Sequence, residues 1–194
     1  MSIALGVNVA ILHQGRLLLT RREDFEVWCL PGGAVDPNES IAQAAVREVW
    51  EETGLEVVLT RLVGLYSRPA WHDGHHNALF VARPIGGELR LCPGETIELA
   101  YFHPAQLPGD LLPWHRRQIA DALAGYGGSV VVTEAGEWPF DPALSRQEIY
   151  ALRDRSGLSR RAFLARHLER TAEIPPQVDV PGVVLPDGLL PEQE

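Results

Sequence analysis

Residues 33–55 constrain this chain more than any other part of its sequence. Within them, residues 40–53 predict a helix that ends at Gly54, since glycine commonly follows the last helical turn. At about 100° per residue, this helix has one apolar stripe and a separate face that concentrates three carboxylates, Glu48, Glu51 and Glu52. We therefore expect one side of the helix to be buried and the other to be strongly acidic.

The acidic face predicts a bound cation. Like charges three or four residues apart repel one another and destabilise a helix, by roughly 0.2–0.5 kcal/mol per pair. Mg²⁺ or Mn²⁺ would relieve this repulsion, because hard divalent ions prefer oxygen ligands. Arg47 stands beside Glu48 and can hold a neighbouring carboxylate through two hydrogen bonds. The Pro31-Gly32-Gly33 loop brings backbone amides and carbonyls to the helix start, where a phosphate or a metal can approach closely.

The spacing in this segment resembles the Nudix box, the signature of the Nudix hydrolase family. Trp28 before Leu30-Pro31-Gly32-Gly33 and the later Gly86-Gly87-Glu88-Leu89 also look like that family, and the resemblance covers residues 3–125. The box matches at every position that it specifies: Gly33, Glu39, Arg47, Glu48, Val49, Glu51, Glu52, Gly54 and Leu55.

The resemblance implies a Nudix fold, an α/β/α sandwich around a mixed β-sheet. It implies hydrolysis of a nucleoside diphosphate linked to another moiety, with Mg²⁺ or Mn²⁺ as cofactor. In the family pattern Glu48, Glu51 and Glu52 take the metal-ligand positions, and the Gly33 carbonyl would be a further ligand.

The resemblance also implies supporting and proton-accepting residues. Glu39 and Arg47 take the positions of a supporting salt bridge, which is structural rather than catalytic. Three glutamates are candidates for the general base. Glu48 fills that role in some members of the family, and others use a glutamate of a later loop, for which Glu95 and Glu98 are the candidates here.

The remaining residues indicate the α+β class. Strands and helices are mixed without regular βαβ alternation, which favours a sandwiched sheet over a doubly wound one. Strands are predicted at residues 3–12, 16–20, 28–30, 55–66, 77–83 and 98–102, a turn at 86–87, and helices at 104–107 and 113–124.

The Nudix domain is expected to span residues 1–125. Residues 126–173 form a helical C-terminal extension, with a returning strand at 129–133, a helix from the capping box at Ser145 and Glu148 to about residue 155, and a second helix at 159–170. We expect the extension to pack on the catalytic domain or on a second subunit. Residues 174–194 are a proline-rich tail, expected to be irregular or disordered.

Substrate-binding candidates lie outside the box. Arg21, Arg22 and Arg68 could contact phosphates, Trp28 could stack on a base or ribose, and His76 belongs to a polar loop expected to border the active site. Pro69 stands at or next to the position where family members acting on ADP-ribose tend to carry a proline. ADP-ribose or another nucleotide sugar is therefore our first substrate class, and a (d)NTP is the alternative.

Charge and hydropathy limit the partners and the compartment. Seventeen basic residues, all arginine, stand against 26 acidic ones, and the net charge of −9 argues against broad binding to nucleic acids. The N-terminal residues show no basic segment or cleavage site, and no apolar run is long enough to cross a membrane. We expect a cytoplasmic homodimer that binds a nucleotide and neither a membrane nor a nucleic acid.

A transcriptional regulator is the alternative from another class. Residues 145–170 hold seven arginines and three acidic residues, on two short predicted helices that superficially resemble a helix-turn-helix. Arg153, however, stands where a small residue normally lets two such helices cross. The complete set of box glutamates also favours an enzyme.

Overall fold

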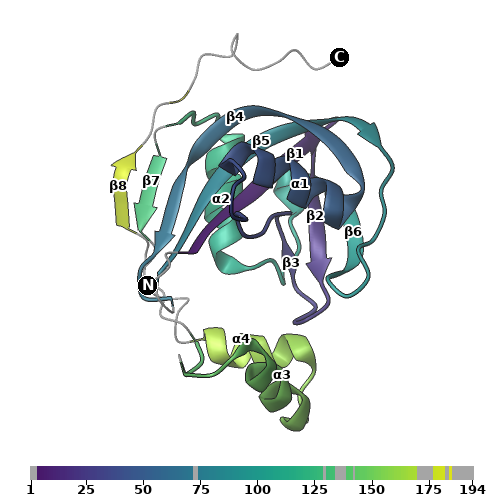
Figure 1. Ribbon diagram of the computed structural model, residues 1–194, viewed down its shortest axis with the longest axis vertical. Helices are drawn as coiled ribbons and strands as arrows, with labels where there is room; N and C mark the ends of the chain where they lie inside the picture. The colour runs from purple at the N-terminus through teal and green to yellow at the C-terminus, as the bar shows by residue number, and fades with distance from the viewer. Residues whose placement is uncertain are drawn as a thin grey trace.

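A computed structural model describes residues 4–71, 74–128, 130–133, 139–141, 143–169, 177–181 and 184. Its helices are α1 (Ile41–Thr53), α2 (Pro113–Leu123), α3 (Arg146–Arg155) and α4 (Arg160–Leu168), with a 3₁₀ turn η1 (Pro104–Gln106). Its strands are β1 (Ala4–His13), β2 (Arg16–Arg22), β3 (Trp28–Cys29), β4 (Leu55–Arg68), β5 (His75–Gly87), β6 (Thr96–Phe102), β7 (Val130–Thr133) and β8 (Gln177–Pro181) (Figure 1).

The described strands form one mixed sheet. Their order is β3-β2-β1-β5-β4-β7-β8, and β6 pairs with β2 outside this path. The β1–β2 and β4–β5 pairs are antiparallel, whereas β1–β5 and β4–β7 are parallel. The expectation of a mixed sheet without regular βαβ alternation is confirmed.

Helices cover both faces of this sheet. Along β1, Val7, Val9 and Ile11 pack in one apolar cluster with the α1 side chains Ala45 and Val49. The intervening Ala10 belongs to a second cluster with Ile119 and Ala122 of α2. Because neighbouring residues of a strand point to opposite faces, this alternation places α1 on one side of the sheet and α2 on the other. The α/β/α sandwich is confirmed.

The ends of α1 follow the sequence signals. The Ser40 hydroxyl accepts a hydrogen bond from the Gln43 amide at 3.1 Å, and the Gln43 side chain accepts one in return from the Ser40 amide at 2.8 Å. Gly54 ends the helix with a φ of 75°, in the left-handed region that favours glycine. A Cβ at Gly54 would lie 2.4 Å from the Glu88 carbonyl oxygen, so a larger residue would disturb this end of the box.

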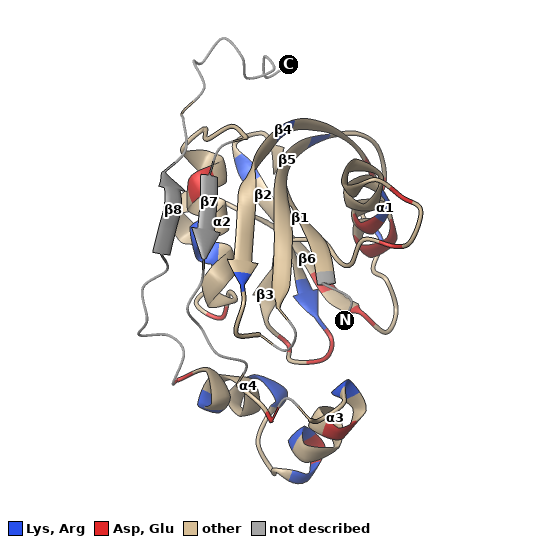
Figure 2. Ribbon diagram, turned by 60° about the vertical axis from the view of Figure 1, so that its left-hand side comes forward, with Lys and Arg blue, Asp and Glu red and all other residues tan. Residues whose placement is uncertain are grey.

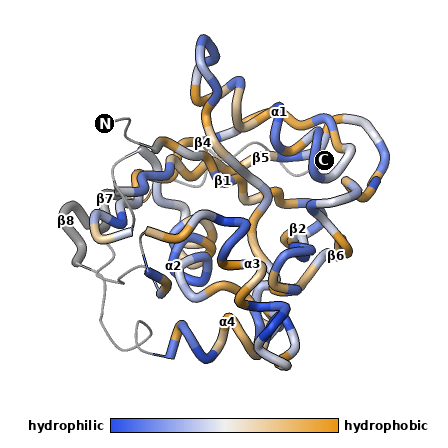
Figure 3. The backbone as a smooth tube through the Cα atoms, turned by 60° about the horizontal axis from the view of Figure 1, so that its bottom comes forward, coloured by the Kyte–Doolittle hydropathy of each residue, from blue (hydrophilic) through white to orange (hydrophobic). Residues whose placement is uncertain are grey.

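The hairpin of α3 and α4 packs at the β3 end of the sandwich (Figure 1), and apolar and polar residues alternate along its two helices (Figure 3). Its apolar side chains share a third cluster with domain residues, and this explains why two such short helices are stable here. The buried members of the cluster are Val27, Cys29 and Leu112 from the domain and Phe140, Ile149, Phe163, Leu164 and Leu168 from the C-terminal extension.

Three sequence expectations need correction. The tail is not irregular throughout, because Gln177–Pro181 forms β8, which pairs antiparallel with β7. Val178 and Val180 favour strand conformation, and Pro181 stands at the strand end, where a proline is tolerated. Residues 86–87, expected as a turn, continue β5, and the helix expected at residues 104–107 is a 3₁₀ helix of three residues, Pro104–Gln106. Within the part of the chain described, no helix is long and apolar enough to span a membrane.

Candidate active site

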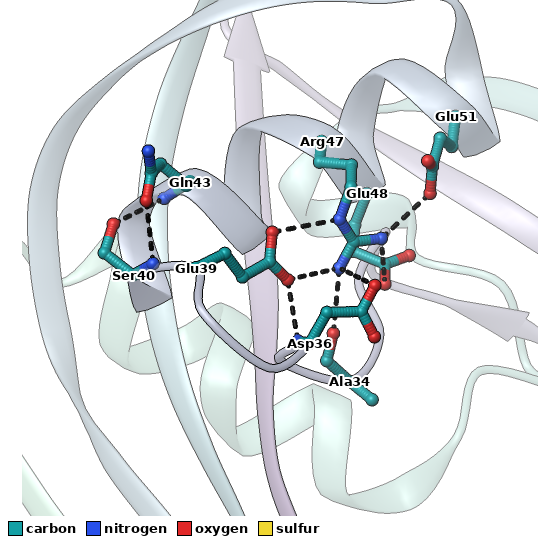
Figure 4. Close-up of polar contacts among 8 residues, drawn as sticks. All are labelled: Ala34, Asp36, Glu39, Ser40, Gln43, Arg47, Glu48 and Glu51. Carbon is teal, nitrogen blue, oxygen red and sulfur yellow. Dashed lines mark hydrogen bonds and ion pairs between the residues drawn. The ribbon is translucent and has the colours of Figure 1, made fainter.

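Arg47 organises the acidic face of α1. Its Nη2 and Nε donate to the two carboxylate oxygens of Glu39 at 2.6 and 3.1 Å, and its Nη1 donates to Glu48 Oε1 and Glu51 Oε2, each at 2.9 Å (Figure 4). Its Nη2 also donates to the Ala34 carbonyl at 3.0 Å. One guanidinium thus ties the loop before α1 to two carboxylates of the helix, in the geometry expected of a supporting salt bridge.

Glu52 and Glu48 are the two partly buried carboxylates of this face. Glu52 accepts a hydrogen bond from the Gly32 amide at 3.1 Å. Burial, with a contribution from the Glu48 charge, raises the pKa of Glu52 to about 8. Burial likewise raises the pKa of Glu48, against the opposing effect of Arg47. Burial thus disfavours the ionised form of both carboxylates, and a cation would compensate their charge.

Gly33 lies directly against the Glu48 carboxylate. A Cβ at Gly33 would lie 2.4 Å from Glu48 Oε1. The Gly33 carbonyl accepts a hydrogen bond from the Val7 amide at 2.9 Å, which uses one of its two lone pairs and leaves the other for a further ligand. Glycine is needed at position 33 because a side chain there would collide with the Glu48 carboxylate.

Replacing Gly33 by alanine should lower turnover at least tenfold with little loss of folding. The added methyl group can be accommodated only if the Glu48 side chain moves, and a displacement of about 1 Å in an active site can cost about 100-fold in rate. Steady-state kinetics and a thermal melt would check this. Gly109→Ala is the control for stability, since Gly109, like Gly33, has no φ in the left-handed region and an added Cβ there meets no atom within 4 Å. Turnover of Gly33→Ala close to that of the wild type would contradict the close packing.

The donor set fits a hard divalent cation. Glu48, Glu51 and Glu52 offer only carboxylate oxygens, and Figure 2 shows acidic residues gathered on α1. Among the residues that the structure describes, no three potential ligand side chains converge as a preformed metal site. The hydrogen bonds explain this, because Arg47 holds Glu48 and Glu51 while the Gly32 amide holds Glu52.

The two candidate bases of the later loop differ in their surroundings. Glu98 of β6 is paired with Arg21 of β2, with Oε2 at 3.1 Å from Nη1. The charge of Glu95 instead helps to raise the pKa of both Glu48 and Glu52, so Glu95 lies on the side of the acidic face. The structure thus brings Glu95 toward the box and leaves Glu98 in an exposed ion pair.

A cavity of about 620 Å³ begins at the first residues of the box. Residues 32–34 line one part of it, and residues of α3, including Tyr150, line another. Arg68 is also part of its wall. The Arg68 side chain is buried, with a relative exposure of 4%, and its guanidinium lies 4.6 Å from the ring centres of Trp71 and Trp114. The cavity therefore combines aromatic and cationic walls next to the acidic face.

Of the two predicted phosphate contacts on β2, only one lies at the cavity. Arg22 lines the cavity and pairs with Asp24. Arg21 points elsewhere, toward Glu98 and the Glu26 carbonyl.

The expectation for Trp28 is wrong. It has a relative exposure of 6% and packs edge-on against Phe102 in the core, with ring centres 4.9 Å apart, so it cannot stack on a base. His76 lies beside Ser67, 2.9 Å from its hydroxyl, and its neighbour His75 lines the cavity instead. His72 and Asp73 of the same loop lie outside the described residues.

Sequence reasoning missed His115 of α2. Its Nδ1 accepts a hydrogen bond from the Leu30 amide at 2.9 Å, and its ring lines the cavity. Burial, assisted by the positive charges of Arg68 and Arg22, holds its pKa well below the usual histidine range, so it is neutral. No signal in the sequence could have singled it out, because the 113–124 segment has the pattern of an ordinary amphipathic helix.

Adding Mg²⁺ or Mn²⁺ to the metal-free protein should raise its melting temperature, and more so at pH 8 than at pH 6. The carboxyl of Glu52 has a pKa near 8 in the folded protein and an ordinary low value in the unfolded chain. Its contribution to stability is therefore present at low pH and is lost as the pH rises through about 8. A cation competes with that proton and binds best once the proton has left. Thermal melts across this range would check this, and a melting temperature indifferent to both metals would contradict it.

Comparison with known proteins assigns the family. The family model described as "NUDIX domain" matches residues 3–122. A Bacillus subtilis protein provisionally named 8-oxo-dGTP diphosphatase is 41% identical over 121 residues, covering 62% of this chain and 80% of the relative. An ADP-ribose pyrophosphatase of Methanocaldococcus jannaschii is 34% identical over 110 residues, covering 54% of this chain and 64% of the relative.

Solved structures agree with this assignment. An ADP-ribose pyrophosphatase of Streptococcus suis has a TM-score of 0.55 at 29% identity, covering 63% of this chain and 90% of its own. A MutT Nudix hydrolase of Burkholderia pseudomallei has a TM-score of 0.57 at 26% identity, covering 62% and 98%. With its complete box on an α/β/α sandwich, this chain belongs to the Nudix family of hydrolases.

Proposed function

We propose that this enzyme cleaves the pyrophosphate of a nucleoside diphosphate linked to another moiety, with ADP-ribose or another nucleotide sugar as the first substrate class. The observation that carries this proposal is the position of the cavity. Its wall includes Gly32 and Gly33, which contact the carboxylates of Glu52 and Glu48 directly. A substrate in this cavity has its phosphates next to the acidic face of α1.

The box residues take separate roles in this proposal. Glu48, Glu51, Glu52 and the Gly33 carbonyl would hold Mg²⁺ or Mn²⁺, the divalent cofactor class that Nudix hydrolases use. When bound, such a cation neutralises charge on the phosphoryl oxygens and acidifies water. Arg47 donates a hydrogen bond to each of Glu48 and Glu51 and so positions both carboxylates.

The attacking water must lose a proton, and two carboxylates near the acidic face could accept it. Glu48 has a pKa raised by burial, which suits a general base. Glu95 is the candidate of the later loop that the structure favours, since Glu98 is engaged by Arg21. Glu95→Gln and Glu98→Gln compared side by side would separate the two, and we expect the larger loss of turnover for Glu95→Gln.

The cavity suits a nucleotide. Its volume of about 620 Å³ falls within the range of about 300–1,000 Å³ typical of small-molecule sites. Trp71 and Trp114 offer aromatic surface, and Arg22 and Arg68 are cations that can face phosphates. Pro69 follows Arg68 at this end of β4. Two relatives named ADP-ribose pyrophosphatase support the nucleotide-sugar class.

A (d)NTP is the second candidate substrate. The observation in its favour is the 41% identity to the Bacillus subtilis protein provisionally named 8-oxo-dGTP diphosphatase. The two candidates differ in product. A nucleotide sugar gives a nucleoside monophosphate and a sugar phosphate, whereas a (d)NTP gives a monophosphate and inorganic pyrophosphate.

A substrate panel would test the proposal. Nucleotide sugars, dinucleotides and (d)NTPs, including 8-oxo-dGTP, are incubated with Mg²⁺ or Mn²⁺, and products are separated by chromatography. We expect AMP and ribose phosphate from ADP-ribose. Cleavage of (d)NTPs alone would favour the second candidate, and no hydrolysis together with a shift of promoter DNA would favour a regulator.

The structure gives the regulator little support. Three arginines of the hairpin hydrogen-bond the domain: Arg153 to the Asp24 carbonyl, Arg160 to the Glu23 carbonyl, and Arg161 to the Asp110 carboxylate. In a helix-turn-helix protein these arginines would instead contact DNA. We therefore propose residues 126–173 as an accessory element of the enzyme.

We also propose that the enzyme is a homodimer acting in the cytoplasm. Val46, Trp50 and Ile85 are exposed apolar side chains around one shallow groove beside α1, a surface that a second copy could cover. Light scattering would give the mass in solution, and a monomer at all concentrations would contradict a dimer.

A further inference from the structure

The α3–α4 hairpin lies outside residues 3–122, the part that the family model matches. We propose that it is nonetheless a working part of the substrate site, in which Tyr150 acts through Asp24 to position Arg22 for a phosphate of the nucleotide. The inference rests on the proposed function. It makes Tyr150 a positioning residue for substrate affinity.

A chain of hydrogen bonds joins the hairpin to Arg22. The Tyr150 hydroxyl donates to Asp24 Oδ2 at 3.1 Å. Asp24 in turn accepts two hydrogen bonds from Arg22, from Nε to Oδ1 at 2.9 Å and from Nη2 to Oδ2 at 2.5 Å. The Asp24 side chain is 12% exposed, so water replaces these contacts poorly. All three residues line the cavity.

Two further contacts of the hairpin hold the same loop. Arg153 Nη1 donates to the Asp24 carbonyl at 2.5 Å, and Arg160 Nη1 donates to the Glu23 carbonyl at 2.6 Å. The Glu23 amide donates to the Glu95 carbonyl at 2.8 Å. The loop of residues 23–26 is thus fixed by the hairpin on one side and touches the loop of Glu95 on the other.

The geometry of Arg22 suits an anion. Asp24 takes the Nε–Nη2 edge of the guanidinium, so Nη1 is directed away from that carboxylate. A guanidinium has five N–H donors in a rigid fork, and those not used by Asp24 can contact a phosphate. The side chain is 42% exposed, which keeps it accessible from the cavity. An arginine held on one edge presents its other donors at a fixed angle, which reduces the entropy lost on binding.

The test is a double-mutant cycle. Tyr150→Phe removes the hydroxyl but keeps the ring, whose centre lies 6.0 Å from that of Phe25. We expect the KM of the best substrate to rise roughly three- to tenfold with kcat within twofold of the wild type, because the lost interaction orders a binding group. Arg22→Lys should raise KM as well, and adding Tyr150→Phe to Arg22→Lys should raise it no further.

Arg161→Gln is the matched control. It breaks another contact of the hairpin with the domain, the 2.9 Å ion pair to Asp110, without touching the loop of residues 23–26. Its KM should stay at the wild-type value. An unchanged KM for Tyr150→Phe, or an equal increase in the Arg22→Lys background, would overturn the inference, since Tyr150 would then act independently of Arg22.

Binding separates this inference from the proposed function. Calorimetry with ADP-ribose, ADP and inorganic pyrophosphate in EDTA gives Kd without turnover, and Tyr150→Phe should weaken the Kd of each bound probe by the same factor as KM. Binding with this pattern in EDTA, together with no hydrolysis of any member of the substrate panel once Mg²⁺ or Mn²⁺ is supplied, would contradict the proposed function and support the positioning role. A wild-type protein that binds none of the three probes would overturn the positioning role itself.

Discussion

Replacing Glu52 by glutamine should reduce turnover of the best substrate about a thousandfold while the metal-free protein stays folded. A bound metal contributes several kcal/mol to stabilising the transition state, and about 1.4 kcal/mol corresponds to a tenfold change in rate. Glutamine removes one ligand charge from the acidic face. Burial already disfavours the ionised form of Glu52, so the neutral amide should not lower the melting temperature.

The measurements are kcat, KM and a thermal melt for Glu52→Gln, with Glu56→Gln as control. Glu56 is an exposed glutamate at the start of β4, four residues further along, and its amide should keep wild-type kinetics. The Gly32 amide can still donate to the oxygen of the new side chain, which keeps the loop in place. Near-normal turnover of Glu52→Gln would contradict the proposal that the box glutamates hold the catalytic cation.

Replacing Phe163 by alanine should lower the free energy of unfolding by about 3–5 kcal/mol, the usual cost of removing a buried phenylalanine. Phe163 of α4 is 4% exposed, and its ring lies 5.7 Å from Phe140 and 4.4 Å from His167, centre to centre. It belongs to the cluster that joins the hairpin to Val27 and Cys29 of the domain. The change would leave a cavity in the packing between the hairpin and the domain.

Denaturant unfolding would measure this effect, with Leu158→Ala as control. Leu158 lies in the turn between α3 and α4 with 40% exposure, so its truncation should cost less than about 1 kcal/mol. A cost below about 1 kcal/mol for Phe163→Ala would mean that the hairpin is not part of the same cooperative structure as the domain.

The local features of the box could be predicted from the sequence. Ser40, Gly54 and the apolar stripe define α1 through capping and periodicity, which depend on residues within a few positions. The acidic face follows from the same periodicity. The Glu39–Arg47 pair is eight residues apart, and the family resemblance predicted it.

The cavity could not be predicted, because long-range contacts build it. Asp24 and Tyr150 are 126 positions apart, and neither carries a local signal for the other. Trp28 failed as a prediction because β3 has only two residues, too few for alternation to show which face is buried. Arg153 marked a departure from a helix-turn-helix, and the structure gives the reason: its side chain is buried against the loop of residues 23–26.

The most direct test of the account is turnover of the best substrate with and without a chelator. The proposed site requires a divalent cation on Glu48, Glu51 and Glu52, so EDTA should abolish hydrolysis and added Mg²⁺ or Mn²⁺ should restore it. Hydrolysis that continues unchanged in EDTA would contradict the account, because the acidic face of α1 would then have no part in the reaction.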